Sequence, residues 1–125
     1  MLAGLTGCAY VSKQYHPAMP TFLVFFSPWS STLDAGGAQT TSTAAAAALK
    51  DPDATVQVVG FASTIGSDAA NQTLAQQRAA AVEAQLIADG VDASRVTAMS
   101  RGATTYQFTP QESRRVEIDI VHAGF

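Results

Sequence analysis

The pattern of apolar and polar positions along the 125-residue chain predicts six secondary-structure elements. Short apolar runs and alternating positions predict strands at residues 22–26, 55–61, 95–100 and 114–121. Alanine-rich or helically spaced stretches predict helices at residues 38–50 and 69–88. The order strand, helix, strand, helix, strand, strand predicts an α+β fold, a βαβαββ-type sandwich in which two helices pack on one face of a mixed β-sheet.

The segments between these elements carry residues that favour turns and loops. Residues 30–37 and 101–111 lack periodic apolar positions and predict loops, and Asp51-Pro52 predicts the end of the first helix. Residues 1–20 contain two prolines and show no clear periodicity. We therefore expect an N-terminal segment and linker at residues 1–20, followed by one folded domain at residues 21–123.

An arginine interrupts the apolar face of the second predicted helix. Leu74, Arg78, Val82 and Leu86 follow one another at intervals of four residues, so they share one stripe of the helix. Asn71 lies two turns before Arg78 and falls on nearly the same side. Because a charge on an apolar face needs a partner, the stripe makes Arg78 a candidate functional residue.

A second arginine lies at a comparable place in the last predicted strand. Arg114 has the same parity as Val116, Ile118 and Ile120, so it lies at the end of the inward-facing side. In the simplest interpretation, such an arginine rests its stem on the edge of the core and keeps its head in water.

Two alternatives therefore stand for the pair of arginines. Each can be an ordinary core-edge residue, solvated or paired with Asp68 or Glu112. Together, Arg78 and Arg114 favour a shared anion site, because a guanidinium donates two parallel hydrogen bonds to a carboxylate. The spacing thus predicts a small carboxylate-bearing ligand near the start of the second helix.

Composition excludes several other classes of function. The formal net charge of -3 and the charged fraction of 14% argue against broad electrostatic binding of nucleic acid. Neither a G-x-S-x-G motif, a phosphate-binding loop nor a metal-ligand spacing occurs in the sequence, and His16 and His122 lie near opposite ends. We expect a non-enzymatic protein with no metal and no cofactor.

The single cysteine follows a recognisable motif. Leu5-Thr6-Gly7-Cys8 resembles the lipobox of bacterial lipoproteins, in which the cysteine is lipidated and becomes the mature N-terminus. No run of apolar residues reaches the length of about 18 that spans a bilayer, so attachment to a membrane would depend on lipid. The alternative for Cys8 is an unmodified thiol.

Five short motifs follow one another along the chain. They are Gly60-Phe61-Ala62-Ser63, Gly66-Ser67, Asn71-x-x-Leu74-x-x-x-Arg78-Ala79, Gly90-Val91 and Ser113-Arg114-Arg115-Val116-Glu117-Ile118. The series resembles the OmpA-like C-terminal domain family, whose pattern reads roughly G-H-T-D…G-S…N-x-x-L-S-x-x-R-A…G-V…N-R-R-V-E-I. The resemblance spans residues 22–121 and implies a βαβαββ-type fold in the periplasm of a Gram-negative bacterium.

The same resemblance implies a function and three ligand contacts. Domains of this family hold the peptidoglycan stem peptide, chiefly through diaminopimelate. Arg78 matches the arginine that takes the diaminopimelate carboxylate, Asn71 the supporting asparagine, and Arg114 the first arginine of N-R-R. With its lipobox-like segment, the chain resembles peptidoglycan-associated lipoproteins, which tether the outer membrane to the wall.

Other positions of the family's ligand site carry different residues here. The aspartate that takes the ligand's ammonium falls on Ser63, the threonine before it on Ala62, and the aspartate after the first strand on Ser27. A charge-assisted hydrogen bond contributes about 1.5–3 kcal/mol, against roughly 1 kcal/mol for a neutral one. Ser63 is therefore expected to weaken ammonium binding by about one to two orders of magnitude, unless another carboxylate such as Asp68 substitutes for the aspartate.

Two functions remain open at this stage. The first is a non-catalytic binding module of the cell envelope that binds the peptidoglycan stem peptide, with Cys8 anchoring it to the outer membrane. The alternative is an OmpA-like fold without peptidoglycan binding, serving as a structural or protein-interaction component of an envelope complex. An exposed apolar patch in place of a polar cleft around Arg78 would mark the alternative.

Overall fold

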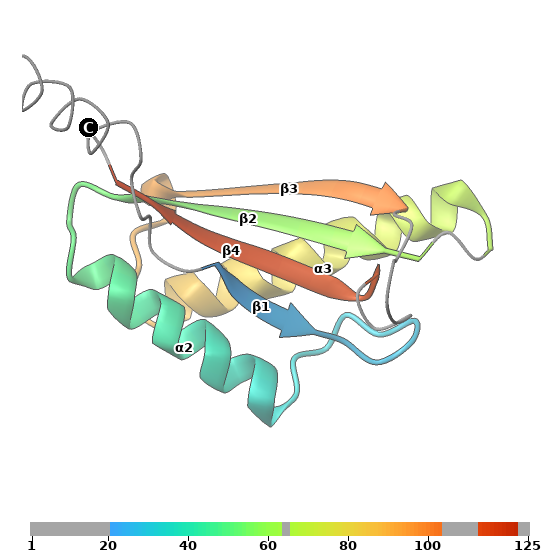
Figure 1. The fold of residues 1–125 in the computed structure, drawn as a ribbon, viewed down its shortest axis with the longest axis horizontal. Coiled ribbons are helices and arrows are strands. Elements are labelled where there is room, and N and C mark those ends of the chain that lie inside the picture. The colour runs from blue at the N-terminus through green and yellow to red at the C-terminus, as the bar shows by residue number, and fades with distance from the viewer. Residues whose placement is uncertain (1–20, 64–65, 104–112, 123–125) are drawn as a thin grey trace, which may run out of the picture.

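The computed structural model describes residues 21–63, 66–103 and 113–122. Four strands form one mixed sheet: β1 (Phe22–Phe25), β2 (Thr55–Ala62), β3 (Val96–Ala103) and β4 (Arg115–Val121). Their order across the sheet is β1-β4-β2-β3. Strand β4 pairs antiparallel with both β1 and β2, whereas β3 runs parallel to β2 (Figure 1).

Two helices, α2 (Ala35–Leu49) and α3 (Asp68–Ala88), cover one face of this sheet (Figure 1). Helix α3 packs mainly on β2 and β3, and α2 packs on β1 and β4. This arrangement confirms the predicted α+β class, with two helices on one face of a mixed sheet. None of the helices in the described part of the chain is long and apolar enough to cross a bilayer.

The core lies between the helices and the sheet. The inward positions of β2 and β4 are almost completely buried: Val56, Val58, Val116, Ile118 and Ile120. The predicted stripe of α3 faces them, and Val82, Leu86 and Arg78 are each 0% exposed. The sequence therefore correctly predicted that this stripe is buried.

The ends of several elements differ from the sequence prediction. Helix α2 begins at Ala35, three residues before the predicted start at residue 38, because Asp34 caps it. The Asp34 carboxylate accepts a hydrogen bond of 2.7 Å from the Gly37 amide. The predicted loop at 30–37 is therefore partly helical, since a side-chain cap compensates for the poor helix propensity of two glycines.

The last two strands are also shifted from their predicted limits. Strand β3 begins at Val96 and continues to Ala103, so the predicted loop does not start at residue 101. Strand β4 begins at Arg115, which leaves Arg114 immediately before the strand. Pairing of β3 with β2 extends the strand, a long-range interaction that the local sequence does not encode.

Helix α3 approaches β2 very closely at Gly60. A Cβ atom at this position would lie 2.2 Å from the Ala75 carbonyl oxygen. The register of β2 against β3 shifts between Gly60 and Phe61. This contact fixes the distance between α3 and the sheet. Arg78 lies one helical turn after Ala75, close to this contact.

Candidate functional site

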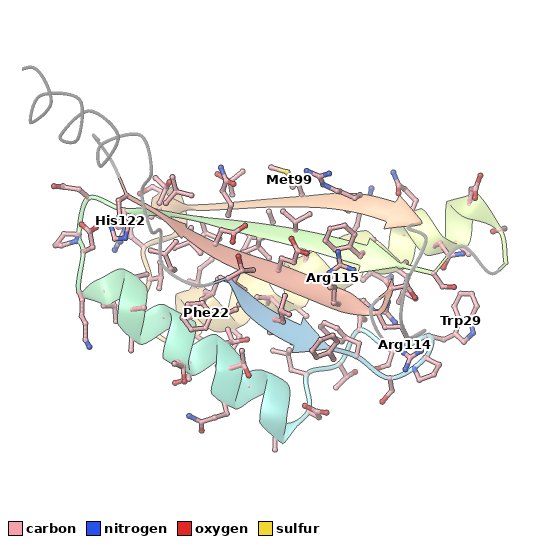
Figure 2. All side chains as sticks on the ribbon, in the orientation of Figure 1. Phe22, Trp29, Met99, Arg114, Arg115 and His122 are labelled. Carbon is pink, nitrogen blue, oxygen red and sulfur yellow. The ribbon has the colours of Figure 1, made fainter. Side chains whose placement is uncertain are left out.

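A pocket lies where the end of β2, the start of α3 and the segment before β4 meet. Its volume is about 120 Å³, enough for a carboxylate-sized group but below the 300–1,000 Å³ of drug-sized sites. Figure 2 shows two of its residues, Trp29 and Arg114, near the same end of the sheet. The residues lining the pocket are Pro28, Trp29, Ser63, Asn71, Leu74, Arg78, Ser113 and Arg114.

Arg78 lies at the base of this site and holds neighbouring backbone in place. Its Nε donates to the Ser30 carbonyl at 2.8 Å, and its Nη1 donates to the Phe61 carbonyl at 3.2 Å. Its Nη2 donates to the Ser27 carbonyl at 3.1 Å. The guanidinium also lies 5.4 Å from the centre of the Phe26 ring. Arg78 therefore connects α3 to β2 and to the segment after β1.

The charge of Arg78 has no acidic partner among the described residues. A guanidinium has five N–H groups. Three of them bond to carbonyl oxygens, so one N–H on each Nη makes no hydrogen bond within the described residues. Burial, and then the positive charge of Arg114, lower the pKa of Arg78 to about 10. Arg78 is thus a cation at neutral pH whose charge no acidic residue in the described part of the chain offsets.

Arg114 supplies a second positive charge to the pocket. Its backbone continues the pairing of β1 with β4, since the Phe26 amide donates to the Arg114 carbonyl at 2.8 Å. Its side-chain Nε donates to the Phe26 carbonyl at 3.0 Å. Within the described residues Arg114 forms no ion pair. Two guanidinium groups thus line one small pocket, a composition suited to an anion.

The first turn of α3 places Asn71 in the pocket. Ser67 caps this helix by accepting a hydrogen bond of 3.0 Å from the Ala70 amide. The Asn71 Nδ2 donates to the Ser67 carbonyl at 3.0 Å, and the side chain is almost completely buried. Ser63, just after the end of β2, is half-buried and also lines the pocket. Both residues contribute polar groups without charge.

The other two candidate positions do not line the pocket. Ala62 is completely buried in a small cluster with Leu74 and Ala75. Ser27 is exposed, and its part in the site is its backbone carbonyl, which accepts from Arg78. The structure thus brings four of the six candidate residues together at the pocket.

Two alternatives from the sequence can be compared with this geometry. The head of Arg78 is not solvated, because the residue is 0% exposed. Asp68 does not pair with it; this exposed residue lines a separate hollow with Arg101. No Asp or Glu lines the pocket among the described residues. Glu112 and Cys8 lie outside the described residues.

The candidate site residues predicted from the sequence do not include Trp29, which forms one wall of the pocket. Its backbone has a φ of 56°, unusual for a residue other than glycine, and it is 61% exposed. The ring rests against Gly66, where an added Cβ would lie 3.2 Å from the Trp29 Cη2. A large aromatic residue in the turn-forming segment Ser27-Pro28-Trp29 was the available signal.

Comparison with known proteins supports the family resemblance. Residues 25–117 match the OmpA family. The probable lipoprotein YiaD of Escherichia coli (strain K12) is 34% identical over 108 residues, which cover 82% of this chain and 49% of YiaD. Outer membrane protein A of Bordetella avium is 33% identical over 103 residues, covering 78% of this chain and 53% of that protein. The chain spans about half the length of these two curated relatives.

Solved structures show the same fold. The peptidoglycan-associated lipoprotein from Burkholderia pseudomallei aligns with a TM-score of 0.69 at 23% identity, covering 79% of this chain and 87% of that one. The OmpA-like domain of FopA1 from Francisella tularensis subsp. tularensis SCHU S4 aligns with a TM-score of 0.72 at 22% identity, covering 83% and 75%. The family match over residues 25–117 shows that this chain belongs to the OmpA family.

Proposed function

We propose that this protein is a non-catalytic binding module of the cell envelope that holds a carboxylate of the peptidoglycan stem peptide between Arg78 and Arg114. The observation that carries the proposal is the buried Arg78 cation, which has no acidic partner in the described part of the chain. Charges buried in proteins are normally paired. A ligand carboxylate would offset this charge and accept the remaining N–H groups.

The chemistry of the pocket divides the family's ligand site into two halves. Arg78, Asn71 and Arg114 provide hydrogen-bond donors for a carboxylate. On the other side, Ser63 is a neutral hydroxyl where the family pattern has the aspartate that takes the ligand's ammonium. Binding of the stem peptide would therefore depend on the carboxylate, with an affinity below that of a site that also holds the ammonium.

We further propose that the protein works in the periplasm, attached to the outer membrane by a lipid on Cys8. The lipobox-like Leu5-Thr6-Gly7-Cys8 supports this proposal, as does similarity to a probable lipoprotein. Mass spectrometry of the protein purified from cell envelopes would test it. A diacylglyceryl adduct on Cys8 is the expected result, and an unmodified thiol contradicts the lipid anchor.

Cosedimentation with purified sacculi tests the binding function. Arg114→Gln removes one charge from the pocket and is expected to reduce pelleting at least about fivefold. Arg101→Gln is the matched control, because the exposed Arg101 lines a different hollow. This pair is preferable to Arg78→Ala, which also removes three hydrogen bonds to backbone. Pelleting that is absent in the wild type, or unchanged by Arg114→Gln, contradicts the proposal.

A second function is favoured by the sheet face opposite the helices. Four apolar side chains on this face are at least 37% exposed: Leu23, Phe25, Met99 and Val121. Single exposed apolar side chains are common, and on this face the charged residues Arg115, Glu117 and Asp119 of β4 lie between those of β1 and β3. If sacculi do not bind, a structural role in an envelope complex becomes the better interpretation. Replacing Leu23 and Met99 by serine would then abolish complex formation in cross-linking experiments, whereas Arg114→Gln would not.

A further inference from the structure

We propose that the pocket prefers a carboxylate whose neighbouring nitrogen is acylated and neutral over one that carries a free ammonium group. The inference rests on the proposed function and names the form of the ligand that the same site would choose. In chemical terms, the favoured group is an N-acylated amino-acid carboxylate, and the disfavoured group is a zwitterionic amino-acid head.

The charges around the pocket give the first argument. Arg78 and Arg114 are both cationic, and no Asp or Glu lines the pocket among the described residues. The two guanidinium groups lie close enough that the charge of Arg114 lowers the pKa of Arg78. An ammonium on the carbon next to the bound carboxylate would meet the same repulsion. It would also lose water without gaining an acidic partner from the described residues that line the pocket.

The polar groups of the pocket suit a neutral nitrogen. Ser63 and Ser113 line the pocket with hydroxyl groups, which accept a hydrogen bond from an amide N–H without a charge. An amide N–H costs far less to remove from water than an ammonium does. Ser63, which stands where the family pattern has aspartate, would thus favour a neutral amide nitrogen over an ammonium, besides weakening the site.

Trp29 gives an independent argument for an acyl group. Its indole is 61% exposed and forms a wall of the pocket together with Pro28. Its positive φ is a conformation that is unfavourable in a residue other than glycine. Such strain is typical of functional sites, and here it keeps an apolar ring at the rim. The methyl or methylene groups of an acyl chain would cover this ring.

The peptidoglycan cell wall contains both forms of this ligand. A free stem peptide ends its diaminopimelate side chain in an ammonium beside a carboxylate. A cross-link between two stem peptides acylates this amine and leaves the carboxylate free. The selectivity of the pocket would therefore direct the protein to cross-linked peptides rather than to uncross-linked ones.

Three small dicarboxylates test the inference by chemical-shift titration of the whole protein. Diaminopimelate carries two ammonium groups, pimelate has no nitrogen, and N,N′-diacetyl-diaminopimelate has two neutral amides. We expect the diacetyl compound to bind on the order of tenfold more tightly than diaminopimelate, with pimelate between them. Equal affinity for the first and third compounds, tighter binding of diaminopimelate, or no binding of any probe overturns the inference.

Two variants separate the effect of a charge at position 63 from the effect of the Trp29 ring. Ser63→Asp should reverse the order by giving the ammonium an acidic partner. Trp29→Asn removes the ring but keeps a residue that tolerates positive φ, and it should reduce affinity for the diacetyl compound to that for pimelate. Neither variant alters an arginine, so the sacculus assay on Arg114→Gln separately tests the proposed function. If sacculi pellet with the wild type but Ser63→Asp leaves the order of the three probes unchanged, only the selectivity is wrong.

Discussion

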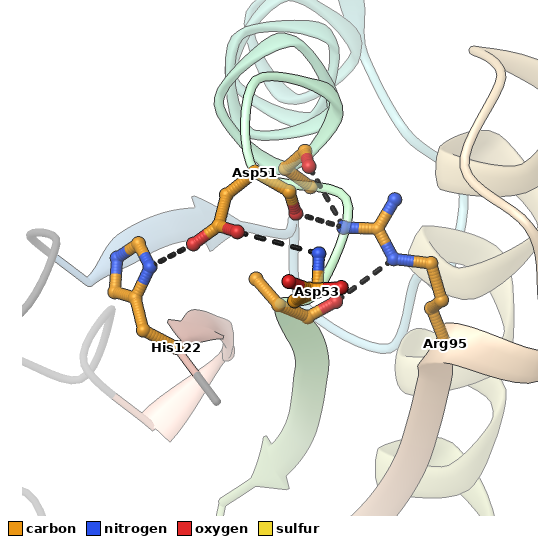
Figure 3. A network of polar contacts seen from close by, with 6 residues as sticks. Asp51, Asp53, Arg95 and His122 are labelled. Atoms are coloured by element: carbon orange, nitrogen blue, oxygen red, sulfur yellow. Dashed lines mark hydrogen bonds and ion pairs between the residues drawn. The ribbon is translucent and has the colours of Figure 1, made fainter. Parts of the chain in front are cut away.

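Arg78 and Arg95 act in the same way near opposite ends of the sheet, but their electrostatic surroundings differ. Each arginine donates three hydrogen bonds to backbone carbonyl oxygens. Arg78 bonds to Ser27, Ser30 and Phe61. Arg95 bonds to Ala48, Asp51 and Ala54, at distances of 2.7–2.8 Å (Figure 3). Both arginines therefore join a helix end or a loop to a strand.

The acids around the two arginines make the difference. The Asp51 carboxylate and the His122 Nδ1 form a hydrogen bond, which is the main reason that the pKa of Asp51 is below its ordinary value. The charge of Arg95 lowers the pKa of Asp51 as well. By contrast, the charged group that acts on Arg78 is another arginine, Arg114. We call an arginine that donates to three backbone carbonyl oxygens a carbonyl clamp, and we call it balanced when nearby acids offset its charge, as at Arg95. A balanced clamp needs no ligand. The clamp at Arg78 is unbalanced among the described residues, so it is the one that indicates an anion site.

Gly60→Val is expected to have the largest effect on stability. It acts at the end of the sheet that carries the pocket, and it changes no charge. The added side chain would begin 2.2 Å from the Ala75 carbonyl oxygen, and backbone cannot yield there as a flexible side chain can. We expect a loss of about 3 kcal/mol in the free energy of unfolding, measured by urea denaturation. Stability within about 0.5 kcal/mol of the wild type would contradict the close helix–sheet contact.

Arg78→Met tests the unbalanced clamp. Three carbonyl groups lose their donor, one of them buried and two partly buried, which we expect to cost about 2–3 kcal/mol of the free energy of unfolding. Pelleting with sacculi should be lost in the same variant, under conditions in which circular dichroism shows it folded. Folded protein that still pellets fully would show that Arg78 is a structural residue alone.

Arg95→Met is the matched test of the balanced clamp. Arg95 is half-buried, so water can replace part of its bonding to the three carbonyls. We expect a smaller loss, about 1 kcal/mol, and unchanged pelleting with sacculi. If Arg95→Met impaired binding as strongly as Arg78→Met, the contrast between the two ends would be wrong.

Asp51→Asn should have the smallest effect, which is present at neutral pH and disappears in acid. Because the folded protein lowers the pKa of Asp51, the carboxylate stabilises the fold above its unfolded pKa of about 3.9. This contribution is lost as the pH falls through the lower, folded value. The melting temperature of the wild type should therefore fall more steeply between pH 5 and pH 2.5 than that of Asp51→Asn. Parallel curves would rule out a role for the contact with His122.

The surroundings of Arg78 and Arg95 also show what the sequence could and could not predict. The four-residue spacing correctly predicted that Arg78 lies on the buried stripe of α3, because helical periodicity is a local property. The carbonyl partners of Arg78 and Arg95 lie 17–51 residues away along the chain, and no local pattern encodes them. The sequence therefore suggested solvation or an acidic partner for Arg78, where the structure has backbone.

The pocket itself was predicted in part. The resemblance indicated Asn71, Arg78, Arg114 and Ser63, and these four do line one pocket. It did not indicate Trp29, because none of the motifs that carry the resemblance includes residue 29 and a positive φ is set by tertiary contacts. The aromatic wall became visible only once Gly66 and the turn after β1 were placed side by side.

The most direct test follows the Nε–H signals of the arginines in ¹H–¹⁵N spectra during a titration with pimelate. This probe carries carboxylates and no nitrogen, so it tests the anion site apart from its selectivity. We predict saturable shifts of the Arg78 and Arg114 signals, with the Arg95 signal unchanged. Shifts of equal size for Arg78 and Arg95, or no shift at Arg78 and Arg114 under saturating pimelate, would contradict the carboxylate site.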